Sequence, residues 1–239
     1  MERTTVGRWH MDALVDVARE LGECDPLAVL VTGSVALGTA TVESDIDLYA
    51  IVPDCLPTRV FRRSLRLGAD VDLWIIDAGY VRDSFWNNAG LLYCFAVGIP
   101  VLDSHGILSS LVVEAKIRYA AGPRPIDPQI AAQLRHRIVT ILDDCERMAR
   151  TQERPDTMLF SNSALRTILK VHCGLTRLWS HDDRVIMANL RAYSPAVAKL
   201  TERILDETTV TGRAELLREL GELVLEPHGG LLRYFQTSL

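Results

Sequence analysis

Lysine is scarce in this chain, and long apolar segments are missing. The 239 residues include only three lysines: Lys116, Lys170 and Lys199. The formal net charge is −5, which argues against binding bulk nucleic acid through a strongly basic surface and leaves only a local basic groove open. The longest apolar run, residues 91–102, is too short for a membrane span. We therefore expect no membrane partner and regard nucleic acid as a less favoured one.

Paired cysteines are also missing from the sequence. The five cysteines form no Cys-x-x-Cys pair and show no zinc-type Cys/His spacing: Cys24, Cys55, Cys94, Cys145 and Cys173. An odd, scattered set fits reduced thiols, and the N-terminal residues show no apolar signal segment. These features predict a cytoplasmic protein.

A polar motif follows an apolar segment near the start of the chain. Residues 28–32 read Ala-Val-Leu-Val-Thr, which suits a buried strand, and Gly33 and Ser34 then predict a turn or short helix. Asp45 and Asp47 lie two residues apart in a second strand-like run. Because side chains alternate along a strand, both carboxylates are expected on one face. The opposite face then carries apolar side chains: Ile46, Leu48 and Ala50.

This motif suits the binding of a metal ion and a phosphate together. Adjacent carboxylates such as Asp45 and Asp47 repel each other unless a cation neutralises them, and hard cations such as magnesium prefer oxygen ligands. Glycine at position 33 lets the backbone approach a ligand, and a turn into a helix there would present N–H groups to an anion. The alternative is a loop with two solvated acids. The apolar flanks of the pair favour the strand.

The Gly33-Ser34 pair, a ten-residue spacer and the run Asp45-Ile46-Asp47-Leu48 resemble the signature of the nucleotidyltransferase superfamily, which includes DNA polymerase beta and kanamycin nucleotidyltransferase. The resemblance implies a third carboxylate on a later strand. Residues 70–76 supply it, and we select Asp72, with Asp70 as the fallback. Within this superfamily, the motif resembles that of aminoglycoside nucleotidyltransferases most.

The resemblance also implies a mechanism. Asp45 and Asp47 would bind two magnesium ions bridged by a nucleoside triphosphate, and Asp72 would complete the site and help to deprotonate the acceptor hydroxyl. In-line attack on the alpha phosphorus would release pyrophosphate. Gly33 and Ser34 are expected to contact the nucleotide. Many relatives carry a basic residue just after Gly-Ser, where this chain has Val35-Ala36-Leu37, so Ser34 and backbone N–H groups would carry more of that contact.

Relatives often place a lysine or arginine of a helical region against the triphosphate. Lys170, on a helix predicted over residues 157–180, is our candidate for nucleotide binding. Arg166 and Arg177 are alternatives, since spacings of four and seven place all three side chains on one helical face.

The remaining pattern predicts the other elements. A helix is expected over residues 6–22, including Trp9, and another over residues 58–67, where Arg59, Arg62, Arg63 and Arg66 recur at spacings of three and four. A strand over residues 71–76, a helical stretch to residue 97 and an edge strand near residues 101–102 follow. Further helices are expected near 108–121, 127–153, 157–180, 183–191, 195–208 and 211–225.

The order of elements predicts an α+β fold with two domains. Residues 1–110 are expected to form a small mixed β-sheet nucleotidyltransferase domain with the catalytic site, and residues 111–239 an all-helical bundle that binds the second substrate. Hydrophobic residues make up 48% of the chain, enough for two such cores. We expect the acceptor in the cleft between them. The acids Asp143, Asp144 and Glu146 could then face an amine-bearing acceptor, although a solvated helix face is the favoured interpretation for any one of them.

The leading hypothesis is an enzyme that transfers a nucleoside monophosphate to a small hydroxylated acceptor, such as an antibiotic or a natural-product intermediate, with a role in antibiotic resistance. One alternative makes the acceptor a protein side chain or a tRNA end, as in toxin and antitoxin nucleotidyltransferases. Another is a nucleotide-binding module without turnover. The preferred base remains open, and so does a homodimer.

Overall fold

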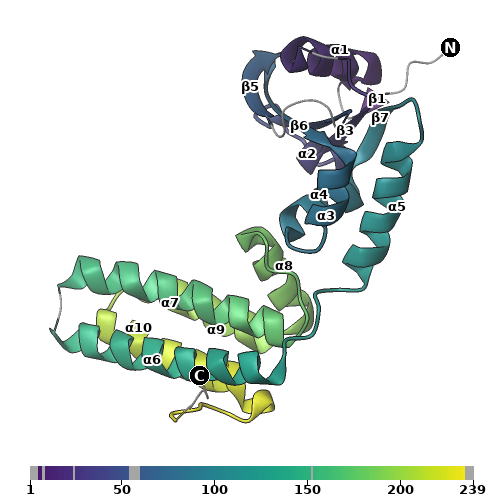
Figure 1. The fold of residues 1–239 in the computed structure, drawn as a ribbon. Helices are drawn as coiled ribbons and strands as arrows, with labels where there is room; N and C mark the ends of the chain where they lie inside the picture. Colours follow the sequence, from purple (N-terminus) through teal and green to yellow (C-terminus); the bar gives the residue numbers. More distant parts are fainter. Residues whose placement is uncertain (1–4, 7–8, 24, 54–59, 152, 235–239) are drawn as a thin grey trace. The chain divides into compact units, whose positions relative to one another are not determined.

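The chain divides into two compact units, Met1–Ala121 and Gly122–Leu239 (Figure 1). This computed structural model describes residues 5–6, 9–23, 25–53, 60–151 and 153–234. Cys24, Cys55 and Arg59 lie outside the described residues. The boundary expected after residue 110 falls inside helix α5, Ile107–Ala120, which packs against α4, Ala89–Val97. This packing keeps α5 with the first unit.

A five-stranded mixed sheet forms the centre of the first unit, in the order β5-β6-β4-β3-β7. The central strands β4 and β6 run parallel, and the other pairs are antiparallel. The strands are β3 Ala28–Thr32, β4 Ile46–Val52, β5 Val60–Arg66, β6 Ala69–Asp77 and β7 Ile99–Asp103. The helices are α1 Met11–Gly22, α2 Gly33–Ala36, α3 Ala78–Ser84, α4 and α5. This arrangement confirms the predicted α+β class and the edge strand near residue 101.

The apolar side of β4 builds the core of this unit. Ile46, Leu48 and Ala50 are fully buried, whereas Asp47 and Tyr49 on the opposite face are half-buried. The alternation follows from the two-residue period of a strand, and the burial of branched side chains stabilises the sheet. Strands β4 and β6 thereby carry their carboxylate side chains on the same face of the sheet.

The predicted helix over residues 6–22 is too long at its start. Helix α1 begins at Met11, and Trp9–His10 form a short strand, β2, paired with β1, Thr5–Val6. The Trp9 side chain is buried, and its Nε1 donates a hydrogen bond to the Leu67 carbonyl at 3.4 Å. This contact is distant in sequence, so local helical spacing did not indicate it.

The predicted helix over residues 58–67 is wrong, because residues 60–66 form the edge strand β5. Leu67 and Gly68 have φ angles of 53° and 73° and make a two-residue turn into β6, the conformation of a type I′ hairpin. Arg62 and Arg63 consequently lie on opposite faces. The pair Leu67-Gly68 between two β-prone runs was the signal in the sequence.

The second unit is entirely helical where the structure describes it, as predicted (Figure 1). Its elements are α6 Pro128–Thr151, α7 Arg154–Leu175, α8 Asp183–Tyr193, α9 Pro195–Asp206, α10 Val210–Leu225 and the 3-10 helix η1 Glu226–His228. Helices α6, α7 and α10 pack against one another. Their shared core includes the fully buried Ile138, Ile168, Leu217 and Leu220. None of the helices in the described ranges has the length and apolar character needed to cross a membrane.

Candidate metal and nucleotide site

Three carboxylates converge at one end of the sheet in the first unit. Asp45 immediately precedes β4, Asp47 lies within it, and Asp72 lies on β6. The parallel register pairs Asp47 directly with Asp72. One oxygen from each of Asp45, Asp47 and Asp72 lies within 4.8 Å of the others. Asp70, one strand period earlier on β6, is not part of this group.

The oxygen atoms of this triad suit a hard divalent cation. Asp72 Oδ1 is shielded from solvent and accepts no hydrogen bond, although Arg63 Nε lies 3.2 Å away in an ion pair. A buried carboxylate oxygen without a hydrogen bond is costly unless another positive partner reaches it. The donor set and this unsatisfied atom together fit a metal ion.

Arg63 shares the face of the triad and places a positive charge beside it. It lies directly opposite Asp72 in the β5–β6 register, and its Nη2 is also 3.4 Å from Asp70 Oδ2. Arg62 points to the other face and pairs with Glu23 at 2.8 Å. Arg63 would therefore compete with a metal ion for Asp72, whereas Arg62 would not.

Replacing Arg63 with methionine is expected to strengthen binding of Mn²⁺ alone by about threefold to fivefold, because it removes both a competing partner and a positive charge. Titration calorimetry on the whole protein measures the change. Arg62→Met removes the same charge from the other face and should leave Mn²⁺ affinity nearly unchanged. Equal effects of the two substitutions would contradict a direct competition at Asp72.

The Gly33-Ser34 turn lies against Asp47. Gly33 begins the short helix α2 with a φ of 64°, and a Cβ at this position would collide with Asp47 Oδ2. The Ser34 hydroxyl has no protein hydrogen-bond partner among the described residues, while the Ser34 carbonyl accepts from the Thr39 N–H at 2.9 Å. Glycine is therefore required by both the backbone conformation and the position of Asp47. The free hydroxyl is available to a ligand.

Gly33→Ala is expected to lower the free energy of unfolding of the first unit by about 1–2 kcal/mol, because an L side chain is strained at positive φ. It should also weaken divalent cation binding by displacing Asp47. Urea denaturation and Mn²⁺ titration measure the two effects.

Gly38→Ala is the matched control, since Gly38 has a φ of 68° and a methyl group at this position would meet no atom within 4 Å. The Gly38→Ala substitution should lower the free energy of unfolding by a similar amount and leave cation binding intact. Loss of cation binding in both variants would contradict the specific contact between Gly33 and Asp47.

The groups beside Asp47 on this face are neutral near physiological pH. Burial is the main cause that raises the pKa values of the Tyr49 hydroxyl and the Cys94 thiol, and the two side chains share a hydrogen bond. The Thr32 hydroxyl, opposite Asp47 on β3, donates to the Cys94 carbonyl at 2.9 Å. The tyrosine and the thiol therefore stay protonated near neutral pH, which makes both of them poor general bases.

The predicted nucleotide-binding residues of the helical part lie in the second unit. Lys170 is exposed on α7. Arg166, also on α7, is committed to a bidentate ion pair with Asp183 at 3.0 and 2.5 Å. Arg177 lies beyond the end of α7 with a φ of 58°, and its Nε donates to the Pro123 carbonyl. The predicted helix to residue 180 was too long, so Arg177 does not continue the helical face of the other two.

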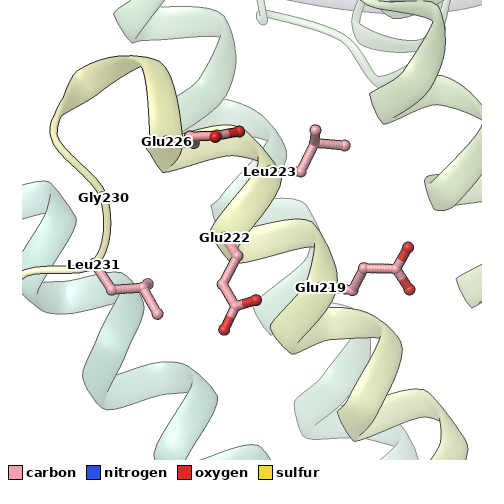
Figure 2. Close-up of a pocket in the computed structure, with 6 residues that line it drawn as sticks. All are labelled: Glu219, Glu222, Leu223, Glu226, Gly230 and Leu231. Atoms are coloured by element: carbon pink, nitrogen blue, oxygen red, sulfur yellow. The ribbon is translucent and has the colours of Figure 1, made fainter.

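The helical unit contains an acidic hollow of about 670 Å³ (Figure 2). Three glutamates of α10 and η1 contribute to its lining with three further residues: Glu219, Glu222, Leu223, Glu226, Gly230 and Leu231. Arg203 lies 3.4 Å from Glu219. Acidity alone does not define a binding site, and we assign no ligand to this hollow.

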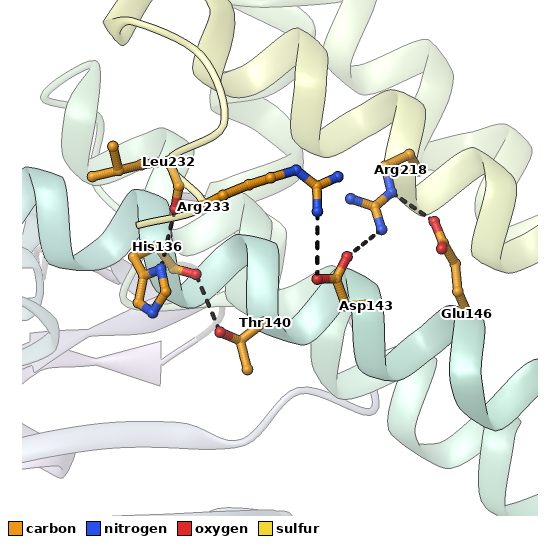
Figure 3. A network of polar contacts seen from close by, with 7 residues as sticks. All are labelled: His136, Thr140, Asp143, Glu146, Arg218, Leu232 and Arg233. Carbon is orange, nitrogen blue, oxygen red and sulfur yellow. Dashed lines mark hydrogen bonds and ion pairs between the residues drawn. The ribbon is translucent and has the colours of Figure 1, made fainter. Parts of the chain in front are cut away.

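The acids expected to face an amine-bearing acceptor are paired inside the helical unit. Arg218 binds Asp143 at 2.7 Å and Glu146 at 2.6 Å, and Arg233 lies 4.0 Å from Asp143 (Figure 3). Asp144 pairs with Arg147 at 2.6 Å. The pairs with Arg218 connect α6 to α10, whereas the Asp144 pair lies within α6. Because these carboxylates already have cationic partners, they are poor candidates for contacts with an acceptor.

The comparisons with known proteins agree with this geometry. Residues 11–72 match the family model described as a nucleotidyltransferase domain, a range that contains Gly33, Ser34 and the triad. No curated protein matches the sequence. The fold is similar to that of a nucleotidyltransferase-like protein from Exiguobacterium sibiricum, with a TM-score of 0.53 and 15% identity over 91% of this chain and 74% of that one. At this identity the likeness shows the fold alone. The match over residues 11–72 thus identifies a nucleotidyltransferase domain within the first unit, and the fold of the chain is similar to that of a nucleotidyltransferase-like protein.

Proposed function

We propose that this chain is a nucleotidyltransferase that uses magnesium to transfer a nucleoside monophosphate from a nucleoside triphosphate to a hydroxyl group of a small-molecule acceptor, with release of pyrophosphate. The observation that carries the proposal is the convergence of Asp45, Asp47 and Asp72 within 4.8 Å on adjoining strands. An antibiotic or another natural product is the class of acceptor that we favour, and resistance would be the consequence of its modification.

The triad residues take different roles in this proposal. Asp45 and Asp47, together with Asp72, would hold two magnesium ions. Bound there, magnesium would stabilise the charge that develops on the attacking and leaving oxygens. Asp72 Oδ1, which accepts no hydrogen bond, is available to take the proton of the acceptor hydroxyl. The hydroxyl oxygen then forms a bond to the alpha phosphorus as the bond to pyrophosphate breaks.

The phosphates are bound by the chain's own polar groups. The backbone at Gly33 lies beside Asp47, and the free hydroxyl of the next residue, Ser34, is a further candidate for a phosphate contact. Lys170 is our candidate for a further contact, because it is exposed and takes part in no ion pair found among the described residues, whereas Arg166 is held by Asp183. The loop after Ser34 adds no cation, since Val35 is buried and Leu37 is apolar.

A second hollow in the helical unit supports the proposal of a small acceptor. It has a volume of about 360 Å³ and is lined mostly by apolar atoms. Its size falls within the range of small-molecule sites, and a few polar groups lie among apolar walls. Its lining comes from α7, α8 and α9 and includes Asn162, Leu165, Leu169, Ile186 and Thr201. The described cysteines Cys94, Cys145 and Cys173 are free thiols, in keeping with our proposal of a cytoplasmic enzyme.

The direct test incubates the protein with each of the four triphosphates, magnesium and pools of hydroxylated acceptors that include aminoglycosides. Pyrophosphate release and a mass increase of one nucleoside monophosphate on an acceptor are expected. A protein substrate pool and deacylated tRNA form parallel arms. Label on protein or tRNA alone would overturn the small-molecule proposal, and no transfer to any arm would favour a binding module.

A further inference from the structure

Two aromatic side chains of the first unit leave large surfaces exposed beside the triad. Phe61 on β5 is 45% exposed and Trp74 on β6 is 40% exposed. They are cross-strand partners, with ring centroids 4.6 Å apart and planes inclined by 42°. Single exposed apolar side chains are common on protein surfaces, whereas adjoining ones often mark a binding site. The exposed pair of Phe61 and Trp74 is therefore a candidate surface for binding a ligand.

The sheet register fixes where this pair lies. One cross-strand row contains Thr32, Asp47, Asp72 and Arg63, in the order β3, β4, β6 and β5. The next row on the same face, two residues along each strand, contains Leu30, Tyr49, Trp74 and Phe61. Side chains two residues apart along a strand project to the same side, roughly 7 Å from each other. The aromatic row therefore adjoins the carboxylate row directly.

Packing within the aromatic row holds Trp74 in place. The Tyr49 ring stacks on Trp74 with centroids 6.4 Å apart and planes at 16°, and Tyr49 also packs on Phe95 of α4 at 5.5 Å. Tyr49 is thus the inner, fixed end of the row. Trp74 and Phe61 form the outer end, where ring surface remains open to a planar ligand.

We propose that Phe61 and Trp74 form the stacking surface for the nucleobase of the triphosphate substrate. This inference rests on the proposed function, because it takes the triad as the place where the phosphates bind. A nucleotide held by its phosphates at the carboxylate row needs a site for its base about one sugar away, and the neighbouring row supplies a ring surface there. Stacking on an aromatic ring depends little on which base is bound, because every base has a π face. This surface therefore favours a broad base preference.

The test compares the binding of magnesium–ATP and magnesium–triphosphate to the whole protein by titration calorimetry, without acceptor. Trp74→Leu should weaken ATP binding by roughly 5- to 50-fold while leaving inorganic triphosphate unchanged, because only ATP carries a base. Phe61→Leu should act in the same direction with a smaller effect.

Trp86→Leu is the matched control. Trp86 is 53% exposed, lies after α3 and packs under the Arg118 guanidinium, 3.7 Å from the ring centroid. The Trp86→Leu variant should bind both magnesium–ATP and magnesium–triphosphate like the wild type. Trp74→Phe keeps a ring and should restore most of the ATP affinity, which also separates stacking from a loss of folding in the leucine variant.

Each remaining outcome has a distinct meaning. If the wild type does not bind magnesium–triphosphate, the proposed metal and phosphate site fails and this inference fails with it. If triphosphate binds and Trp74→Leu binds ATP normally, or loses ATP and triphosphate equally, the stacking role alone is overturned. A change of oligomeric state in Trp74→Leu at unaltered ATP affinity, seen by sedimentation, would identify the pair as a self-association surface instead.

Discussion

Asp47→Asn is expected to abolish nucleotidyl transfer, with a loss of at least about 10³-fold in kcat/KM. Asp47 is the central member of the triad, flanked across the sheet by Asp72 and approached by the turn at Gly33. An amide in its place supplies one neutral oxygen where the site needs an anionic ligand. The fold should be intact or slightly more stable, because the substitution removes one of three carboxylates that repel each other in the absence of metal.

Glu43→Gln is the control for the charge change. Glu43 lies in the exposed turn before Asp45, and its backbone N–H is bonded to the Thr41 hydroxyl at 3.3 Å. It should keep full activity. Steady-state rates and a thermal melt of both variants provide the readout, and normal turnover by Asp47→Asn would reject the two-metal proposal.

Asp72→Asn is expected to reduce kcat by roughly 10²- to 10⁴-fold with a much smaller change in nucleotide affinity. Its Oδ1 is the buried oxygen that accepts no hydrogen bond and that we assign to the acceptor proton. A role exercised in the transition state lowers kcat and kcat/KM together, whereas a role in ground-state binding would raise KM. Single-turnover kinetics with saturating magnesium–nucleotide separate the two cases.

Asp70→Asn tests whether the correct residue of β6 has been selected. Asp70 shares a face with Asp72 and pairs with Arg63, but its side chain is exposed and it does not belong to the triad. The substitution should change kcat by no more than about twofold, as expected for an exposed ion pair. An essential Asp70 together with a dispensable Asp72 would show that the catalytic acid lies two residues earlier.

Local patterns were sufficient for the elements that make up the proposed site. The apolar segment before Gly33 and the alternation through Asp47 predicted β3, α2 and β4, because strand period and glycine conformation are local properties. The helices of the second unit followed from their spacing of apolar residues in the same way. Gly33 and Asp72 were selected with help from a family resemblance, and the structure groups Asp72 with Asp45 and Asp47.

Residues 60–66 show where local patterns fail. The arginines in this segment recur at spacings of three and four, which is typical of one helical face, yet the segment is the edge strand β5. Its conformation depends on hydrogen bonds to β6 and on the positive φ angles of Leu67 and Gly68. Pairing between strands is a contact with a neighbour, which the pattern of one segment does not contain.

The sequence by itself predicted the α+β class, the strands on either side of Gly33-Ser34 and the helices of the second unit, because hydrophobic period and turn chemistry are properties of short segments. It also indicated Asp45 and Asp47, whereas Asp72 was chosen through the family resemblance. Only the tertiary structure decided which residues surround those acids. It placed Arg63 against Asp72, set Phe61 beside Trp74 in the next row, and engaged Asp143 and Glu146 with Arg218. Each of these contacts depends on strand register or helix packing, and such distances between remote residues exist only once the chain has folded.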